Sequence, residues 1–514
     1  MVARIQSIHP VRPLRGSMLG PALALWGVGL LAVIVLLWLT TDISGIFPNF
    51  FLLPWVFLAG AVILAPSAWL IYKGRFDFFH PLVFATWSYI FPAFVIGGLI
   101  VAFDLVEWYF LSFIEDPRYT LPLSLVYITI GFAGLTAGYF MPVGRWLSNI
   151  AEKRAPKWEW RPERFWIAGL VLLAIGSGVN ILGFLQGILG FQRNIDIGSF
   201  DAALYFLLTL LTMGTVLLWL SVFSTKQRTG MFYIILMLLI LFIPLRMAFM
   251  GSRGGLIVGL LPIVFAYYHS GRKVKLKSTL VFAALASVAL VVGSAYGTIF
   301  RNIKGTEASV AVESYSGMVL DTFDHMLEAD PGVILTETSN ALIARVENLT
   351  SVAVVVSNYE KLAPYEAAYG LENNIINDLF GALIPRFLWT NKPPTSDARS
   401  YSDLYFNFGD NSFAVTPFGD LLRNFGPIGI PFGMMLLGFY LRFIYSFLIE
   451  TPFSSIWRKT CYYVLLTVVS YEAFYATLFP SIVRVSFVIV IGLCIIRFLL
   501  PKPQGPMTST GGAA

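Results

Sequence analysis

The chain has 514 residues, of which 57% are hydrophobic and only 12% charged, and its formal net charge is +6. Water-soluble proteins carry about twice this share of charged residues, so the composition excludes a soluble multidomain protein, and it equally excludes a disordered chain. The sequence is that of a polytopic membrane protein. Cys461 and Cys494 both lie in apolar stretches, which leaves no disulfide framework and no cysteine-rich metal site.

Apolar stretches long enough to cross a bilayer, about 20 residues each, recur along the chain. Twelve of them are predicted to be membrane-spanning helices. They lie near residues 19–40, 51–72, 81–103, 121–142, 165–187, 202–224, 231–249, 254–269, 279–298, 426–449, 459–479 and 481–500. The seventh and eighth nearly touch, so we expect them to form a hairpin.

Lys and Arg are unevenly distributed among the loops between these stretches. They recur in every second loop, for example in residues 143–164 and 270–278, whereas alternate loops such as 41–50 carry almost none. Because cytoplasmic loops are enriched in basic residues, the pattern predicts that both termini are cytoplasmic. Membrane topology thus explains most of the net positive charge.

One predicted loop is far longer than the others and holds more than half of the acidic residues. A structureless loop of this length is rare in a compact protein, so we expect amphipathic helices over 310–329, 335–358 and 371–388. The predicted fold class is an all-α polytopic membrane protein with about 12 transmembrane helices and one large, partly helical extracytoplasmic loop. The expected division is a nine-helix membrane region 1–298, a cap 299–425, a three-helix membrane region 426–500 and a cytoplasmic tail 501–514.

Four arginines lie at the outer ends of predicted spans, where the preference for basic residues inside disfavours them. They are Arg246, Arg253, Arg301 and Arg484. Ionisable groups at membrane depth are expensive and mark functional sites by default. A guanidinium binds phosphate oxygens in a bidentate manner and stays charged, so an outward-facing diphosphate site is one interpretation. Snorkelling, or pairing with loop carboxylates, is the other.

Two further groups of polar residues lie in the long loop. Arg386, Lys392 and Arg399 fall within fourteen positions of a proline-rich stretch that also carries Asp397, which suits a fixed anion clamp or a solvated loop with ion pairs. Asp420 and Arg423 are three residues apart and share one face if the segment is helical. They form either part of the site or a surface pair.

Three more loop residues are candidates with weaker patterns. Arg345 and Glu347 lie in a predicted helix of the loop, and His325 is its only histidine. A lone histidine is more often structural than a general base. No H-E-x-x-H, D-x-D or P-loop motif occurs in the chain, so we expect no metal, no nucleotide-driven step and no cofactor, and nothing in the sequence points to nucleic acid.

With these features the chain resembles the Wzy-type polysaccharide polymerases, within the broad O-antigen polymerase and ligase group of bacterial membrane proteins. The resemblance rests on Arg345 and three stretches: Gly251-Ser252-Arg253-Gly254, Ile384 to Trp389 with Lys392-Pro393, and Thr416 to Gly426 around Gly419-Asp420. It covers residues 250–430; elsewhere only the hydropathy is similar. Position 420 is often glutamate in similar chains.

The resemblance implies a metal-independent glycosyltransferase of the multi-span, GT-C-like type in the bacterial inner membrane. It would join polyprenyl-diphosphate-linked oligosaccharide repeat units, as donor and acceptor, at the outer leaflet, with a chain-length regulator and a flippase as partners. The leaving diphosphate would be stabilised by basic residues, and the acceptor hydroxyl would need a base. The diphosphate candidates are Arg253, Arg345, Arg386, Lys392, Arg399, Arg423 and Arg484; the candidate bases are Asp397, Asp420, Glu347 and His325.

Other interpretations share much of this evidence. A ligase that moves finished polymer onto lipid A core would have the same fold and diphosphate site. A transporter or flippase for lipid-linked sugars is compatible with twelve spans, although transporters usually show paired halves with interrupted helices. A scaffold without chemistry leaves the outer arginines unexplained.

Overall fold

The computed structural model describes most of the chain between residues 47 and 501. The described range omits residues 107, 187–203, 205, 227, 251–254, 272–275, 306–311, 329, 385–388, 390–395, 410–411 and 452–454. Within the described residues every regular element is a helix and no strand occurs. The all-α prediction is therefore confirmed for this part of the chain.

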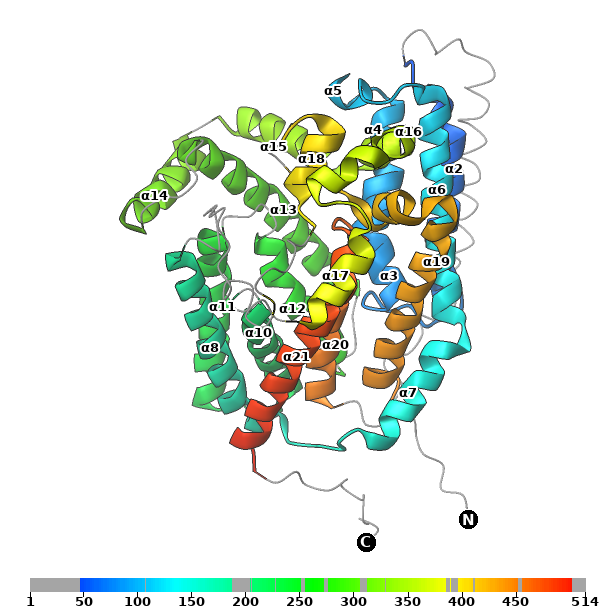
Figure 1. Cartoon of the computed structure of the whole chain (residues 1–514). Helices are drawn as coiled ribbons and strands as arrows, with labels where there is room; N and C mark the ends of the chain where they lie inside the picture. The colour runs from blue at the N-terminus through cyan, green and yellow to red at the C-terminus, as the bar shows by residue number, and fades with distance from the viewer. Residues whose placement is uncertain are drawn as a thin grey trace.

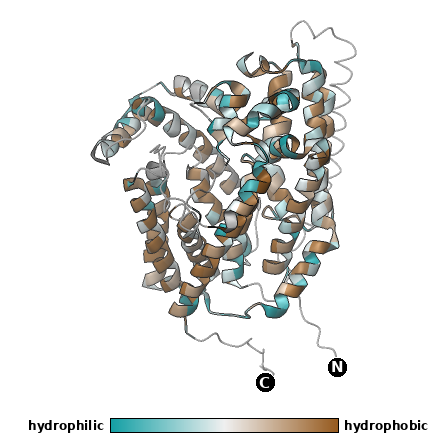
Figure 2. Ribbon diagram, in the orientation of Figure 1, coloured by the Kyte–Doolittle hydropathy of each residue, from teal (hydrophilic) through white to brown (hydrophobic). Residues whose placement is uncertain are grey.

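Seven helices in the described residues are long and apolar enough to cross a membrane. They are Phe50–Tyr72, Pro81–Ala102, Pro117–Phe140, Pro162–Leu185, Ala284–Lys304, Thr416–Leu448 and Tyr475–Leu499. Each coincides with one of the twelve predicted spans. Figure 2 shows apolar residues along much of these helices, as expected for surfaces that face lipid. The protein is therefore an all-helical membrane protein.

The remaining predicted spans correspond to shorter or undescribed segments. Three are the shorter apolar helices Thr209–Ser224, Gly230–Arg246 and Val258–His269. The predicted span 459–479 is interrupted: α20 (Ile456–Thr467) ends within it, residues 468–474 are not helical, and residues 475–479 already belong to the next helix. The predicted span 19–40 lies outside the described residues. The number of spans thus remains a prediction.

The most extensive helix contact among the described residues joins α6 (Pro117–Phe140) to α19 (Thr416–Leu448), which run side by side (Figure 1). Small residues allow it: a Cβ on Gly138 would lie 2.1 Å from the Met435 carbonyl oxygen, and one on Gly438 would lie 2.2 Å from that of Leu135. Glycines at such interfaces let helix backbones approach in lipid, where no hydrophobic force draws helices together. This contact joins a helix from the first part of the chain to one near its C-terminal end.

Replacing Gly138 by alanine is expected to destabilise the protein by about 1–3 kcal/mol, because a backbone carbonyl cannot yield without separating the helices. Thermal unfolding in detergent micelles measures the change. Gly178 is the matched control, since a Cβ there meets nothing within 4 Å. Gly178→Ala is expected to be neutral or slightly stabilising, and an equal loss in both variants would contradict the packing argument.

The predicted span 81–103 is helical but changes type along its length. It consists of α3 (Pro81–Ala85), a π-helical segment η3 (Thr86–Ile96) and α4 (Gly97–Ala102). Pro92 lies inside the π-helical segment, and proline removes a backbone donor and disfavours regular α-helix. Long π-helical segments are rare, and short ones occur frequently at functional sites.

The predicted cap region contains α14 (Val312–Glu328), α15 (Pro331–Val346), α16 (Leu349–Leu362), η5 (Ala363–Tyr369), α17 (Asn374–Leu383) and α18 (Ala398–Phe406). The prediction of one helix over 335–358 is wrong. The chain breaks at Glu347 and Asn348, because the Asn348 amide donates to the Ala93 carbonyl at 3.2 Å while the Glu347 carboxylate caps α16. Tertiary contact with η3 thus overrides the apolar periodicity.

Two other elements differ from their predicted bounds. The helix predicted over 371–388 corresponds to α17, which covers Asn374–Leu383. It packs along the membrane helix α21 (Tyr475–Leu499), so it extends farther toward the membrane helices than the other cap helices do (Figure 1). Non-helical Gly426, with a φ of 67°, divides α19 into two helical segments, and the second begins directly after it, as predicted for the span 426–449. The segment 416–425, assigned to the loop, is therefore the first part of α19.

Candidate functional site

A network of charged and amide side chains lies buried where α17, α19 and α21 meet. Asp420, Arg423 and Asn424 follow one another at helical spacing on α19, so they share one face. That face meets Asn374 on α17, and the backbone of α21 at Ala476. Buried polar groups are costly unless they are paired, so their concentration here marks the candidate site.

Asp420 is the centre of this network and is fully buried. One carboxylate oxygen accepts hydrogen bonds from Asn374 Nδ2 at 3.1 Å and Asn424 Nδ2 at 3.3 Å, as well as from Arg423. The other accepts the Ala476 amide at 2.9 Å. Asp420 therefore joins three helices, and both of its oxygens are engaged.

The Arg423 guanidinium is also fully buried and lies between two carboxylates. Its Nη2 donates to Asp420 at 2.7 Å and its Nη1 donates to Glu366 at 2.6 Å. Tyr405 donates to the same Glu366 oxygen at 2.9 Å, and the guanidinium lies over the Phe474 ring. The positive charge is compensated inside the protein, which leaves little of it for an external anion.

The start of α19 is held in a strained conformation. Thr416 is buried and has a φ of 60°, which is an outlier for a β-branched residue. Its amide donates to the Glu472 carbonyl at 3.2 Å, and its hydroxyl accepts the Gly419 amide at 3.2 Å. Strain of this kind persists only where surrounding contacts over-determine it, and it clusters at functional sites.

A second carboxylate, Asp378 on α17, lies beside this network and was not among the predicted site residues. It is buried, and it accepts the Ser396 hydroxyl at 2.7 Å and the Ser396 amide at 3.2 Å. Burial raises the pKa of Asp378, and the nearby charge of Arg484 on α21 opposes that rise. The signal in the sequence is the spacing of Asn374 and Asp378 by four residues, which places both on one face of a mostly apolar helix.

Glu347 occupies a separate buried position between α15 and α16. Its carboxylate accepts the amide of Thr350 at 2.8 Å and also the Thr350 hydroxyl. Burial raises the pKa of Glu347 from 4.5 to about 7 despite these bonds. Arg345 forms an exposed ion pair with Glu472 at 3.9 Å, and both lie in electrostatic range of the half-buried Tyr89 on η3. Glu472, the partner of Arg345, lies four residues before Ala476, whose amide donates to Asp420. The same short segment therefore contacts the region of Glu347 and that of Asp420.

We expect the protein to lose stability as the pH rises from about 4.5 to about 7, because folded Glu347 holds its proton more tightly than the unfolded chain does. The slope from this group is at most about 1.4 kcal/mol per pH unit. Unfolding measured across this range in the wild type and in Glu347→Gln tests it. Asp77, whose pKa burial raises to about 6, contributes to both proteins, so the difference between them isolates Glu347. Identical pH profiles would contradict the expectation.

The structure brings some of the predicted residues together and separates others. Asp420 and Arg423 are in direct contact. Asp378 lies within electrostatic range of both Asp420 and Arg484. Asp397 is exposed and caps α18 by accepting the Arg399 amide at 3.0 Å. His325 is exposed on α14, at the edge of the molecule away from α18 and α19 (Figure 1). Arg253, Arg386 and Lys392 lie outside the described residues.

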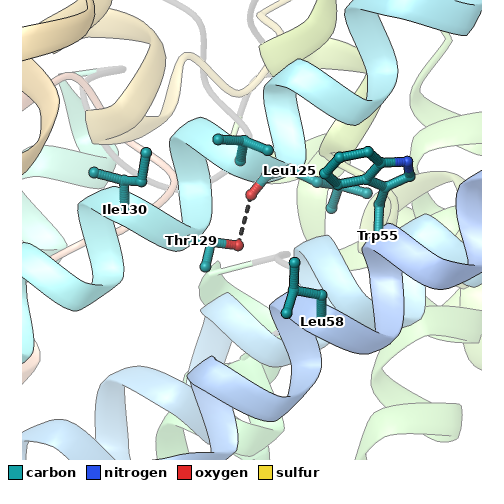
Figure 3. Close-up of a pocket in the computed structure, with 6 residues that line it drawn as sticks. Trp55, Leu58, Leu125, Thr129 and Ile130 are labelled. Carbon is teal, nitrogen blue, oxygen red and sulfur yellow. Dashed lines mark hydrogen bonds between the residues drawn. The ribbon is translucent and has the colours of Figure 1, made fainter.

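The described part of the chain holds no cluster of metal ligands, and the pocket found there is apolar. It holds no group of three or more His, Cys, Asp and Glu side chains that could bind a metal ion. The pocket in Figure 3 is almost wholly apolar and lies between α2 (Leu53–Tyr72) and α6. Its lining residues are Trp55, Leu58, Leu125, Val126, Thr129 and Ile130. The Thr129 hydroxyl donates to the Leu125 carbonyl, so this pocket offers no reactive group.

Fold and site define an all-helical membrane protein with a charged network buried at one end of its bundle. The chain belongs to the family described as "Domain of unknown function (DUF8712)", whose model matches residues 182–491. The matched range includes Glu347, Glu366, Asp378, Asp420, Arg423 and Arg484. No curated protein and no solved structure matches the chain.

Proposed function

We propose that this protein is a polysaccharide polymerase of the Wzy type. It is a metal-independent, multi-span glycosyltransferase that joins polyprenyl-diphosphate-linked oligosaccharide repeat units at the outer face of the bacterial inner membrane. The observation that supports this most is the charged network around Asp420 and Arg423, with Asp378 and Arg484 beside it. A protein that only anchored or sealed a membrane would not need such a costly arrangement.

The proposed topology places this network on the outer side. It keeps twelve spans, cytoplasmic termini and an extracytoplasmic region formed by α14 to α18. The donor and acceptor lipids then lie between the membrane helices while their sugars reach the network. A chain-length regulator and a flippase are the proposed partner proteins.

The reaction replaces one bond at the anomeric carbon of the donor by another. The bond from that carbon to the diphosphate oxygen breaks, and a bond to the acceptor hydroxyl oxygen forms. The bonding pair of electrons leaves with the polyprenyl diphosphate, and the hydroxyl proton passes to a base. The donor carries its own driving force, so the step needs no nucleotide.

Stabilising the leaving diphosphate requires cations directed at the charge that develops on its oxygens. Arg484 is the proposed diphosphate ligand among the described residues, with Arg399 and Arg345 as further candidates, and Arg253, Arg386 and Lys392 complete the proposed set. Arg423 is assigned a positioning role instead, because Asp420 and Glu366 already hold its guanidinium. It fixes α19 against η5.

The proton acceptor must be a carboxylate with a free oxygen near the leaving group. Asp378 fits best: both Ser396 hydrogen bonds go to its Oδ2, and it is electrostatically coupled to Arg484. Glu347 ranks below Asp378 because Thr350 already donates to both of its oxygens, but its pKa of about 7 suits a base at neutral pH. Asp420 has both oxygens occupied, Asp397 serves as a helix cap, and His325 is remote, so these three are not favoured.

The test is incubation of the purified full-length protein with a polyprenyl-diphosphate-linked repeat unit in detergent or vesicles. Polymerase activity produces a ladder of longer lipid-linked products. Transfer to a different lipid acceptor identifies a ligase, and movement of the substrate across vesicles without new products identifies a transporter. Asp378→Asn is the matched inactive control, since it preserves side-chain size, and a normal ladder from it would reject its role as base.

A further inference from the structure

An amphipathic helix, α7 (Pro142–Arg154), leaves the membrane bundle directly after α6. Only Met141 separates the two helices, and its extended backbone turns the chain sharply. Since α6 is long and apolar enough to span the membrane, α7 begins where the hydrocarbon region ends. It then runs obliquely away from α6 (Figure 1).

One face of α7 is fixed against the protein. Gly144 and Ser148 are buried, and a Cβ on Gly144 would lie 2.7 Å from the Phe439 carbonyl oxygen of α19. Near its other end, Glu152 accepts from the fully buried Arg458 at 2.6 Å. The helix is therefore attached at both ends, and its rotation about its own axis is set.

A second face exposes large apolar side chains. Val143, Trp146, Leu147 and Ile150 are 39%, 61%, 41% and 42% exposed, respectively. Their spacing of three and four residues places them in one continuous stripe. The described residues leave a large part of each of these side chains exposed, although a soluble helix would have them buried.

A third face carries two of the three basic residues of α7, and the third, Arg154, ends the helix in line with the apolar stripe. Arg145, Asn149 and Lys153 recur at every fourth residue and are all exposed, so they form a polar line on the side away from Leu147. Basic and apolar faces on one helix, with tryptophan near the boundary, are typical of helices that lie in a membrane interface.

We propose that α7 is an interfacial helix that binds the anionic phospholipid headgroups of the adjacent leaflet. The stripe Val143, Trp146, Leu147 and Ile150 enters the acyl boundary, while Arg145 and Lys153 hold the phosphates. A lipid surface suits the helix better than a protein partner does, because α7 continues from a membrane helix and its charge is complementary to anionic lipid. Because α7 is attached to α19 and α20, the bound leaflet also orients the bundle.

Depth measurement tests the apolar stripe. The full chain with Cys494 replaced by serine is labelled with an environment-sensitive fluorophore at Ile150→Cys or at Asn149→Cys and reconstituted into lipid nanodiscs. Bromine on the lipid acyl chains is expected to quench the label at 150, and aqueous iodide the label at 149. Equal quenching of both labels by iodide would overturn the proposal.

Lipid selectivity tests the basic line. The protein is equilibrated with mixed phosphatidylglycerol and phosphatidylcholine, and the lipids retained are measured by native mass spectrometry. Arg145→Gln with Lys153→Gln is expected to reduce the preference for phosphatidylglycerol on the order of tenfold. The control pair Arg118→Gln with Lys361→Gln removes two exposed charges away from α7. An equal loss in the control pair, or no loss in the α7 pair, would overturn the proposal.

Discussion

Replacement of Asp420 by alanine is expected to destabilise the folded protein by about 3–5 kcal/mol, the usual cost of breaking a buried ion pair from one side. The variant leaves Arg423 with Glu366 as its remaining carboxylate partner. It also removes the acceptor for the Ala476 amide and one acceptor for Asn374. Because these groups belong to α17, α19 and α21, we expect the three helices to loosen together. Thermal unfolding in detergent micelles measures the loss.

Asp403 on α18 provides a matched control for this prediction. It is the same residue type in the same region, but its side chain is exposed. Asp403→Ala is expected to change stability by less than about 0.5 kcal/mol. A small effect at both positions would show that the buried network does not hold the helices together.

Replacement of Arg484 by glutamine is expected to lower polymerisation by a factor of about 10²–10³, the typical effect of removing one preorganised stabiliser of a developing negative charge. The side chain lies over the Phe206 ring at 5.1 Å and is electrostatically coupled to Asp378. Its removal therefore affects both the leaving diphosphate and the proposed base. The rate of ladder formation from lipid-linked repeat units measures the effect.

Arg497 lies near the other end of the same helix and serves as the control for charge and residue type. Arg497→Gln is expected to retain full activity. Unfolding temperatures of both variants separate a loss of chemistry from a loss of fold, and Arg484→Lys tests whether charge alone suffices. An active, stable Arg484→Gln variant would remove Arg484 from the proposed site.

Local pattern was enough to predict most of the membrane helices. The spans near residues 51–72, 121–142 and 165–187 appear within a few residues of their predicted bounds. A helix needs about 20 consecutive apolar residues to cross the membrane, so the length of an apolar stretch is enough to locate it. The pairing of Asp420 with Arg423 was likewise available from their spacing. Boundaries set by contacts to distant residues were not, as the break at Asn348 against Ala93 shows.

The amino-acid sequence by itself determined that this is an all-helical membrane protein and that Asp420 and Arg423 share a helix face. Only the tertiary structure decided which distant side chains that face contacts. It placed Glu366 from η5 opposite Arg423 and Asp378 from α17 near Arg484. These partners lie 57 and 106 residues apart in the chain, so no local periodicity relates them. The physical reason is that hydropathy acts residue by residue, whereas the compensation of a buried charge depends on which distant groups the packed helices bring within hydrogen-bonding range.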